Sequence, residues 1–119
     1  MSKFSFEKLD VWQKSKEFTL EIYKITSSFP KAEKFGLVSQ LRRASVSVSS
    51  NIAEGSSRTS ANDQARFYII AYSSSVEILN QLIISKELDF IDQENYEKLR
   101  SDIEHITAML NRLHKATQS

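Results

Sequence analysis

The sequence predicts an all-α fold, an antiparallel up-down-up-down four-helix bundle, from three observations. The 119 residues suit a single domain, expected to span residues 1–119. Two glycines and one proline are too few to punctuate a many-turned β fold. Apolar residues recur at steps of three and four in four segments of roughly 18 to 25 residues with short connections, which is the pattern of antiparallel neighbours.

The first predicted helix runs from about Glu7 to Ser28. Its apolar stripe consists of Leu9, Trp12, Phe18, Ile22, Ile25 and Phe29. Pro30 should end the helix, because a proline pushes the residue before it out of helical geometry. Phe29 is therefore expected to be the last residue that packs against the bundle before the turn.

The second predicted helix runs from about Glu33 or Gly36 to Ala53, and Gly55 is expected to leave it as a left-handed cap. One face is apolar, with Leu37, Leu41, Ala44, Val48 and Ile52. The other faces are unusually rich in small residues, namely Ser45, Ser47, Ser49 and Ser50. Together with Ser73 to Ser75 they predict a close approach of the second and third helices, either as tight packing within one subunit or as a subunit interface.

The third predicted helix begins at a cap formed by Ser60, Asn62 or Asp63 and continues to about Leu88. It is the most apolar of the four. Its stripe is wider than a surface helix needs, so the helix should pack on more than one side. A lone bundle would leave an apolar patch exposed, and the sequence therefore predicts self-association.

The fourth predicted helix follows a turn at Asp89 to Asp92, with Asp92 and Glu94 at its positive end. A heptad seam runs along it through Tyr96, Leu99, Ile103, Ile106, Leu110 and Leu113. The helix should pack along this seam only and keep its charged faces in water.

Composition limits the kinds of site and the cellular location that we expect for the protein. Without cysteine, disulfides, thiolate metal sites and cysteine nucleophiles are excluded. The sequence shows no uninterrupted apolar run of about 20 residues and no signal-peptide core at its start, so a cytoplasmic location without a membrane span is expected. The net charge of +1 is unevenly spread: residues 1–66 carry eleven basic against seven acidic residues (+4), and residues 67–119 carry five against eight (−3). The imbalance fits either complementary helices or a phosphate-binding surface.

Three segments carry a family resemblance: LDVWQKSKEF near the start, FPKAEKFGLVSQLRRASVSVSSNIAEG in the middle, and RFYIIAYSSSVEILNQL after it. From about Phe6 to Leu113 the chain resembles the bacterial four-helix-bundle proteins encoded by 23S ribosomal RNA intervening sequences. That family is similar in fold to the accessory protein of diversity-generating retroelements, a pentameric bundle that partners a reverse transcriptase and nucleic acid. The resemblance implies a bundle, a ring of five subunits and a nucleic-acid context, but it assigns no activity.

A polar set on the second and third helices is the candidate site, formed by Arg42, Arg43, Asn51, Glu54, Arg58 and Glu77. Arg43, Asn51 and Glu54 share one helix face with Ser47. An arginine fork suits a carboxylate as well as a phosphate. The set is therefore interpreted as an internal salt-bridge network, an oligomer contact or a nucleic-acid contact. Were Glu54 desolvated, its replacement by alanine would cost on the order of 1 to 3 kcal/mol.

The sequence offers no catalytic constellation, metal site or cofactor motif. His105 and His114 are nine residues apart on one helix, over about 13 Å along its axis, which is too far to share a metal ion. Asp102 and His105 form a single acid-x-x-His pair, and the further inward carboxylates of a di-metal bundle are not evident. Neither a GxSxG elbow nor a glycine-rich phosphate loop is present.

The sequence thus favours a non-enzymatic, homo-oligomeric helical bundle that serves as an adaptor for RNA or a ribonucleoprotein. The alternative is a protein-protein scaffold with no affinity for nucleic acid. An unrecognised metal-dependent enzyme is a third reading.

Overall fold

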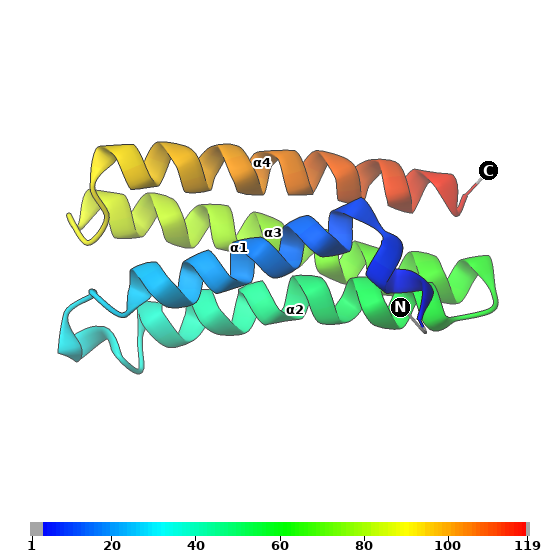
Figure 1. Ribbon diagram of the computed structural model, residues 1–119, viewed down its shortest axis with the longest axis horizontal. Helices are drawn as coiled ribbons and strands as arrows, with labels where there is room; N and C mark the ends of the chain where they lie inside the picture. Colours follow the sequence, from blue (N-terminus) through cyan, green and yellow to red (C-terminus); the bar gives the residue numbers. More distant parts are fainter. Residues whose placement is uncertain (1–3, 119) are drawn as a thin grey trace.

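The computed structural model describes residues 4–118, which form four long helices and two short 3-10 turns. The helices are α1 (Asp10–Thr26), α2 (Leu37–Ser57), α3 (Ala61–Glu87) and α4 (Gln93–Ala116). The 3-10 turns are η1 (Ser5–Lys8) and η2 (Lys31–Glu33). No strand occurs among these residues, and the predicted all-α bundle is confirmed (Figure 1).

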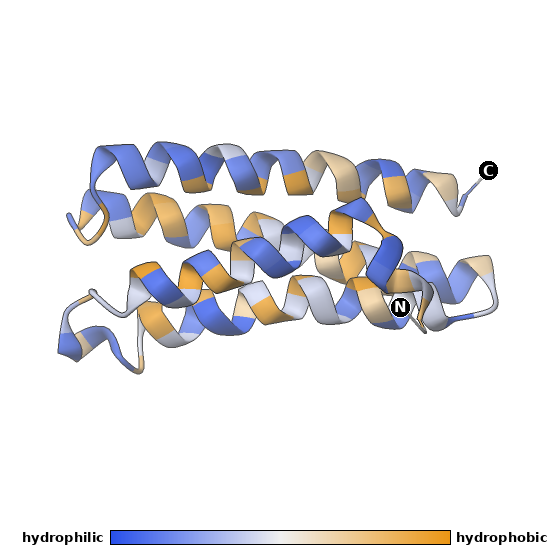
Figure 2. Ribbon diagram, viewed as in Figure 1, coloured by the Kyte–Doolittle hydropathy of each residue, from blue (hydrophilic) through white to orange (hydrophobic). Residues whose placement is uncertain are grey.

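Each helix packs against its neighbours in the chain, and α1 and α4 close the bundle. The elements alternate in direction, so the α1–α2 and α3–α4 turns lie at one end and the α2–α3 turn lies at the other (Figure 1). Apolar residues gather between the helices, while the outer edge of α4 is hydrophilic (Figure 2). Fully buried side chains from all four helices form the core, among them Ile22, Leu41, Ile52, Ile78, Leu82, Ile103 and Leu110.

The start of the chain differs from the prediction, because α1 begins at Asp10 and residues 5–8 form the separate turn η1. Phe6 lies edge-on to Trp12, with ring centroids 4.9 Å apart. This aromatic contact folds the segment before α1 back onto the bundle.

The predicted end of α1 is confirmed within two residues. The helix stops at Thr26, whose hydroxyl donates to the carbonyl of Ile22 at 2.6 Å. Phe29 is 7% exposed and its ring centroid lies 5.5 Å from that of Phe90 in the α3–α4 turn. This contact ties the two turns at this end together.

The predicted role of Gly55 is wrong. The glycine is not a left-handed cap, because α2 continues through it to Ser57 and no glycine in the described residues has a positive φ. A Cβ on Gly55 would lie 2.5 Å from the ring of Tyr68 on α3. Glycine is therefore required for the close approach of a neighbouring helix. Burial of Tyr68 in this contact raises the pKa of its phenol.

The predicted cap of α3 and the predicted placement of Asp92 at the start of α4 are confirmed. The Ser60 hydroxyl accepts from the Asp63 amide at 3.1 Å at the start of α3. The Asp92 carboxylate accepts from the Asn95 amide at 2.8 Å at the start of α4. The α4 seam is confirmed at its centre, where Leu99, Ile103, Ile106 and Leu110 are buried.

The serine-rich stretches bring helices close together, as predicted. Ser47 and Ser74 share a hydrogen bond of 2.9 Å between α2 and α3. The serines also face other neighbours, since Thr107 of α4 donates to the Ser75 hydroxyl at 2.9 Å. On the opposite flank of α2, the Thr19 hydroxyl lies 3.2 Å from the Ser45 carbonyl and donates to it.

Among the described residues, α3 is long and apolar enough to cross a membrane, judged by length and composition alone. In the bundle it packs against both α2 and α4. Its buried face includes the polar side chains of Ser74, Ser75, Gln81 and Ser85. α3 therefore contributes polar as well as apolar side chains to the interior of the bundle.

Replacement of Gly55 by alanine tests the close approach of α2 and α3. The added methyl group would collide with the buried ring of Tyr68. Overpacking of this kind costs about 1 to 3 kcal/mol, which exceeds the gain of about 1 kcal/mol in helix propensity. Urea unfolding should show a net loss of stability, whereas exposed Ser50→Ala should stay within about 0.5 kcal/mol of the parent. A Gly55→Ala protein as stable as the parent would contradict the packing.

Candidate interaction surfaces

The outward face of α3 is an apolar stripe, called here the outer seam. It consists of Ala65, Ile69, Tyr72, Val76, Leu79 and Ile83, at steps of four and three. Within it, Ile69 is 43% exposed, Val76 is 47% exposed and Ile83 is 37% exposed. Ile70 and Ile84 extend the exposed apolar surface on one flank. The exposed members Ile69, Val76 and Ile83 each follow a buried residue by one position, so the outer seam lies about 100° around α3 from the buried seam. Its members Tyr72 and Leu79 are half-buried and pack against the core.

The sequence predicted that α3 packs on more than one side, and within one chain α2 and α4 do contact it. The prediction did not separate the two seams. The sequence does contain evidence for a second seam, because Ile69, Val76 and Ile83 are spaced by seven residues. This repeat is distinct from the one formed by the buried residues of α3.

A second group of exposed apolar side chains lies on α1 and α2. Leu20 is 64% exposed, Tyr23 is 43% exposed and Val46 is 41% exposed. α1 does not pack against α3 in the bundle, so this group and the outer seam belong to different sides of the molecule.

The predicted polar set divides into local pairs. Arg43 on α2 lies 3.5 Å from Glu77 on α3, and both side chains are well exposed. Asn51 donates to the carbonyl of Ser47 at 2.8 Å, one turn back on α2. The face shared by these residues therefore lies along the junction of α2 and α3.

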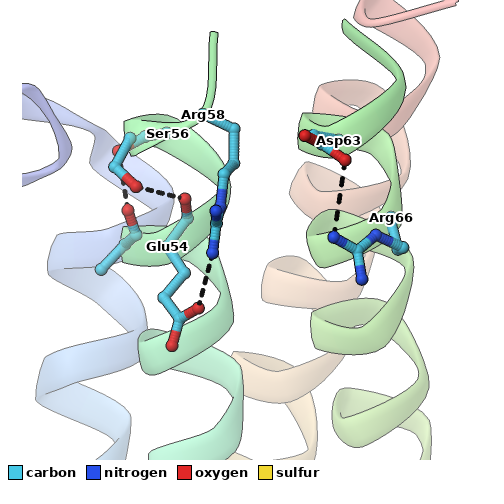
Figure 3. Close-up of polar contacts among 7 residues, drawn as sticks. Glu54, Ser56, Arg58, Asp63 and Arg66 are labelled. Carbon is cyan, nitrogen blue, oxygen red and sulfur yellow. Dashed lines mark hydrogen bonds and ion pairs between the residues drawn. The ribbon is translucent and has the colours of Figure 1, made fainter. Parts of the chain in front are cut away.

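Glu54 pairs with Arg58, not with Arg43. Their charged atoms are 3.5 Å apart at the end of α2, next to a separate pair of Asp63 and Arg66 on α3 (Figure 3). The Glu54 and Arg58 side chains are 58% and 43% exposed. Glu54 is therefore not desolvated in the single chain, and its pair with Arg58 should contribute little to the stability of the fold.

Arg42 lies on the opposite flank of α2 from Arg43. Its Nε donates to the Thr26 hydroxyl at 2.9 Å, and its Nη2 donates to the Tyr23 carbonyl at 3.2 Å. The guanidinium also stacks 4.6 Å from the Tyr23 ring centroid. The structure therefore does not bring Arg42, Arg43 and Arg58 into one patch on a single chain.

A groove of about 420 Å³ lies between α1 and α4. Phe18 and Ile106 are among its lining residues, together with the charged or polar side chains of Lys14, Glu17, Glu21, Lys98, Asp102 and His105. Asp102 is already paired with Lys98 at 3.4 Å. Within residues 4–118, no three His, Cys, Asp or Glu side chains are grouped to hold a metal ion.

The family is decided by comparison with known proteins. Residues 7–112 match the family described as 23S rRNA-intervening sequence protein. The chain belongs to this family. The match covers all four helices except about the last turn of α4.

A solved structure shares the fold. It is a protein of unknown function from the S23 ribosomal protein family of Bacteroides thetaiotaomicron VPI-5482, determined as a crystal structure. The two chains are 27% identical and superpose with a TM-score of 0.80 over 88% of this chain and 98% of the other. No curated protein matches the chain. The family is thus established, and its function is not.

The replacement Glu54→Ala tests the exposed pair. Because both partners face water, the loss of stability should be less than about 1 kcal/mol. Glu104→Ala is a matched control, since Glu104 forms a similar exposed pair with Arg100 at 3.4 Å. Thermal unfolding of both variants should give similar small shifts. A loss of several kcal/mol for Glu54→Ala alone would mean that the residue is buried in the assembled protein.

Proposed function

We propose that this protein is a non-enzymatic, homo-oligomeric bundle that acts as an adaptor for RNA or a ribonucleoprotein in the cytoplasm. The observation that carries the proposal is the outer seam of α3. Its exposed residues Ile69, Val76 and Ile83 repeat every seven positions, about two turns on each side of Val76, and such a repeat is the surface that a second helix covers in a coiled coil.

Self-association is supported by shape and charge. The outer seam and the apolar group on α1 and α2 are different surfaces, and contact between two different surfaces generates a ring when the rotation between subunits closes. Charge favours the same pairing, because residues 1–66 carry a balance of +4 and residues 67–119 carry −3. The family resemblance suggests a ring of five.

The RNA role draws on the family context and on multivalency. A single chain of charge +1 offers little to a polyanion, but a ring repeats each basic surface in every subunit. Salt-sensitive binding with little sequence preference is then expected.

The alternative is a protein-protein scaffold without affinity for nucleic acid. The exposed apolar groups would support that role equally well. Filter binding of structured RNA at two salt concentrations separates the two, because phosphate contacts make affinity fall steeply with salt. Absence of binding at low salt would favour the scaffold.

The replacement Val76→Asp tests the outer seam. A charge at the centre of an apolar interface would be stranded there, so the variant should dissociate while remaining helical. Light scattering at micromolar concentration should give an oligomer mass for the parent and a monomer mass for Val76→Asp. Ser101→Asp, on the exposed face of α4, should keep the parent's mass. A monomeric parent would overturn self-association, and an oligomeric Val76→Asp protein would move the interface elsewhere.

A further inference from the structure

The corner between α1 and α2 combines a basic pocket with an exposed aromatic ring. The pocket has a volume of about 380 Å³. Lys31, Lys34 and Arg42 contribute its positive charges, while Phe29, Pro30 and Val38 contribute its apolar lining. Phe35, the residue after Lys34, is 87% exposed. This apolar ring stands in water on an ordered turn, where it is accessible to a stacking partner.

The charges in this pocket are not neutralised by the protein. No ion pair joins Lys31, Lys34 or Arg42 to a carboxylate within residues 4–118. In contrast, Arg43, Arg58, Arg66 and Arg100 each pair with an acid. Glu33 is the one acid between Ser27 and Arg42, and its carboxylate accepts from the Leu37 amide at 3.1 Å. The segment therefore carries a net charge of +2.

Arg42 is held in place for a ligand. A guanidinium has five N–H donors, and Thr26 and Tyr23 accept from two of them. Thr26 is only 2% exposed, so the anchor is rigid. Three donors remain on a side chain whose orientation is already fixed, which reduces the entropy lost when an anion binds.

The turn that carries the lysines is also ordered. Pro30 precedes η2, and the Glu33 and Lys34 amides donate to the carbonyls of Pro30 and Lys31 at 2.9 and 3.2 Å. Lys34 lies with its Nζ 5.4 Å from the centroid of the Phe35 ring. The cation therefore lies over one face of the ring.

The neighbouring α3–α4 turn is acidic and limits the direction of approach. It carries Asp89 and Asp92, and its Phe90 packs against Phe29. An anion should therefore approach from the side of α1 and α2 (Figure 1).

We infer that this corner binds an unpaired RNA segment, with a phosphate in the pocket of Lys31, Lys34 and Arg42 and a base stacked on Phe35. Basic side chains next to exposed aromatic rings are the combination that single-stranded nucleic acids require. The inference rests on the proposed RNA role. It assigns RNA binding to a surface that does not include Arg43 or Arg58.

Fluorescence anisotropy with a labelled oligouridine of about ten nucleotides tests the phosphate contact. Lys31→Ala combined with Lys34→Ala should weaken binding about tenfold at low salt and reduce the logarithmic salt slope by about 0.7, the contribution of one phosphate contact with a single strand. Both lysines are exposed, so the helical signal and the oligomer mass should match those of the parent. An altered mass would assign the corner to subunit contact and overturn the inference.

The α2–α3 turn provides a matched control. Arg58 and Arg66 lie 4.7 and 4.9 Å from the centroid of Phe67, but each is paired with an acid. Arg58→Ala combined with Arg66→Ala removes the same charge and should change affinity less than about twofold. If both double variants lost affinity equally, or if only the variant at the α2–α3 turn lost affinity, the inference would be overturned, but the proposed RNA role would not. A parent that binds no oligouridine and no structured RNA would remove both.

Phe35 separates stacking from charge. Phe35→Ala should weaken binding of the oligouridine about tenfold with an unchanged salt slope. Phe35→Tyr should restore affinity, because it keeps the ring. Neither variant should alter binding of an RNA duplex of equal length, whose bases are not free to stack. Equal binding of oligouridine by Phe35→Ala and the parent would remove the base contact.

Discussion

The packing of α3 governs the architecture. It is the longest helix, it lies against both α2 and α4, and fully buried Ile78 and Leu82 place its inner seam in the core. Small residues on its neighbours make this packing close. Gly55 accepts the ring of Tyr68, and Ser47 meets Ser74 at hydrogen-bond distance. The same length and regularity that bury one seam leave the other in water.

The polar residues follow from this arrangement. Those on the α3 side of α2, such as Arg43, find acids on the same or the adjacent helix and form exposed pairs that contribute little stability. Arg42 faces α1 instead, where buried Thr26 and a backbone carbonyl hold it and no acid neutralises it. The adjacent residues Arg42 and Arg43 therefore have different binding partners, because successive side chains on a helix point about 100° apart and face different neighbouring helices. Lys31, Lys34 and Arg42, which form no ion pair within residues 4–118, lie together where α1 turns into α2.

Periodicity predicted the elements that depend on one helix alone. The α4 seam could be predicted because each of its positions faces the same side, and the caps at Ser60 and Asp92 are local bonds. Gly55 was misread because its role is set by a ring on another helix, which spacing does not show. For the same reason spacing placed Glu54 on the correct face but did not identify Arg58 as its partner. Phe35 lies in a turn, where side chains do not follow a helical repeat, so the spacing of apolar residues did not predict that it is exposed.

The central claim, that the outer seam of α3 is covered by a second copy of the chain, is tested most directly by thiol labelling. The parent has no cysteine, so Val76→Cys introduces a single reporter at the centre of the seam, and Ser101→Cys provides a reporter on α4. The account predicts that a maleimide labels Ser101→Cys at every protein concentration, but labels Val76→Cys only after dilution into the monomer. Equally rapid labelling of both cysteines at high concentration would contradict it.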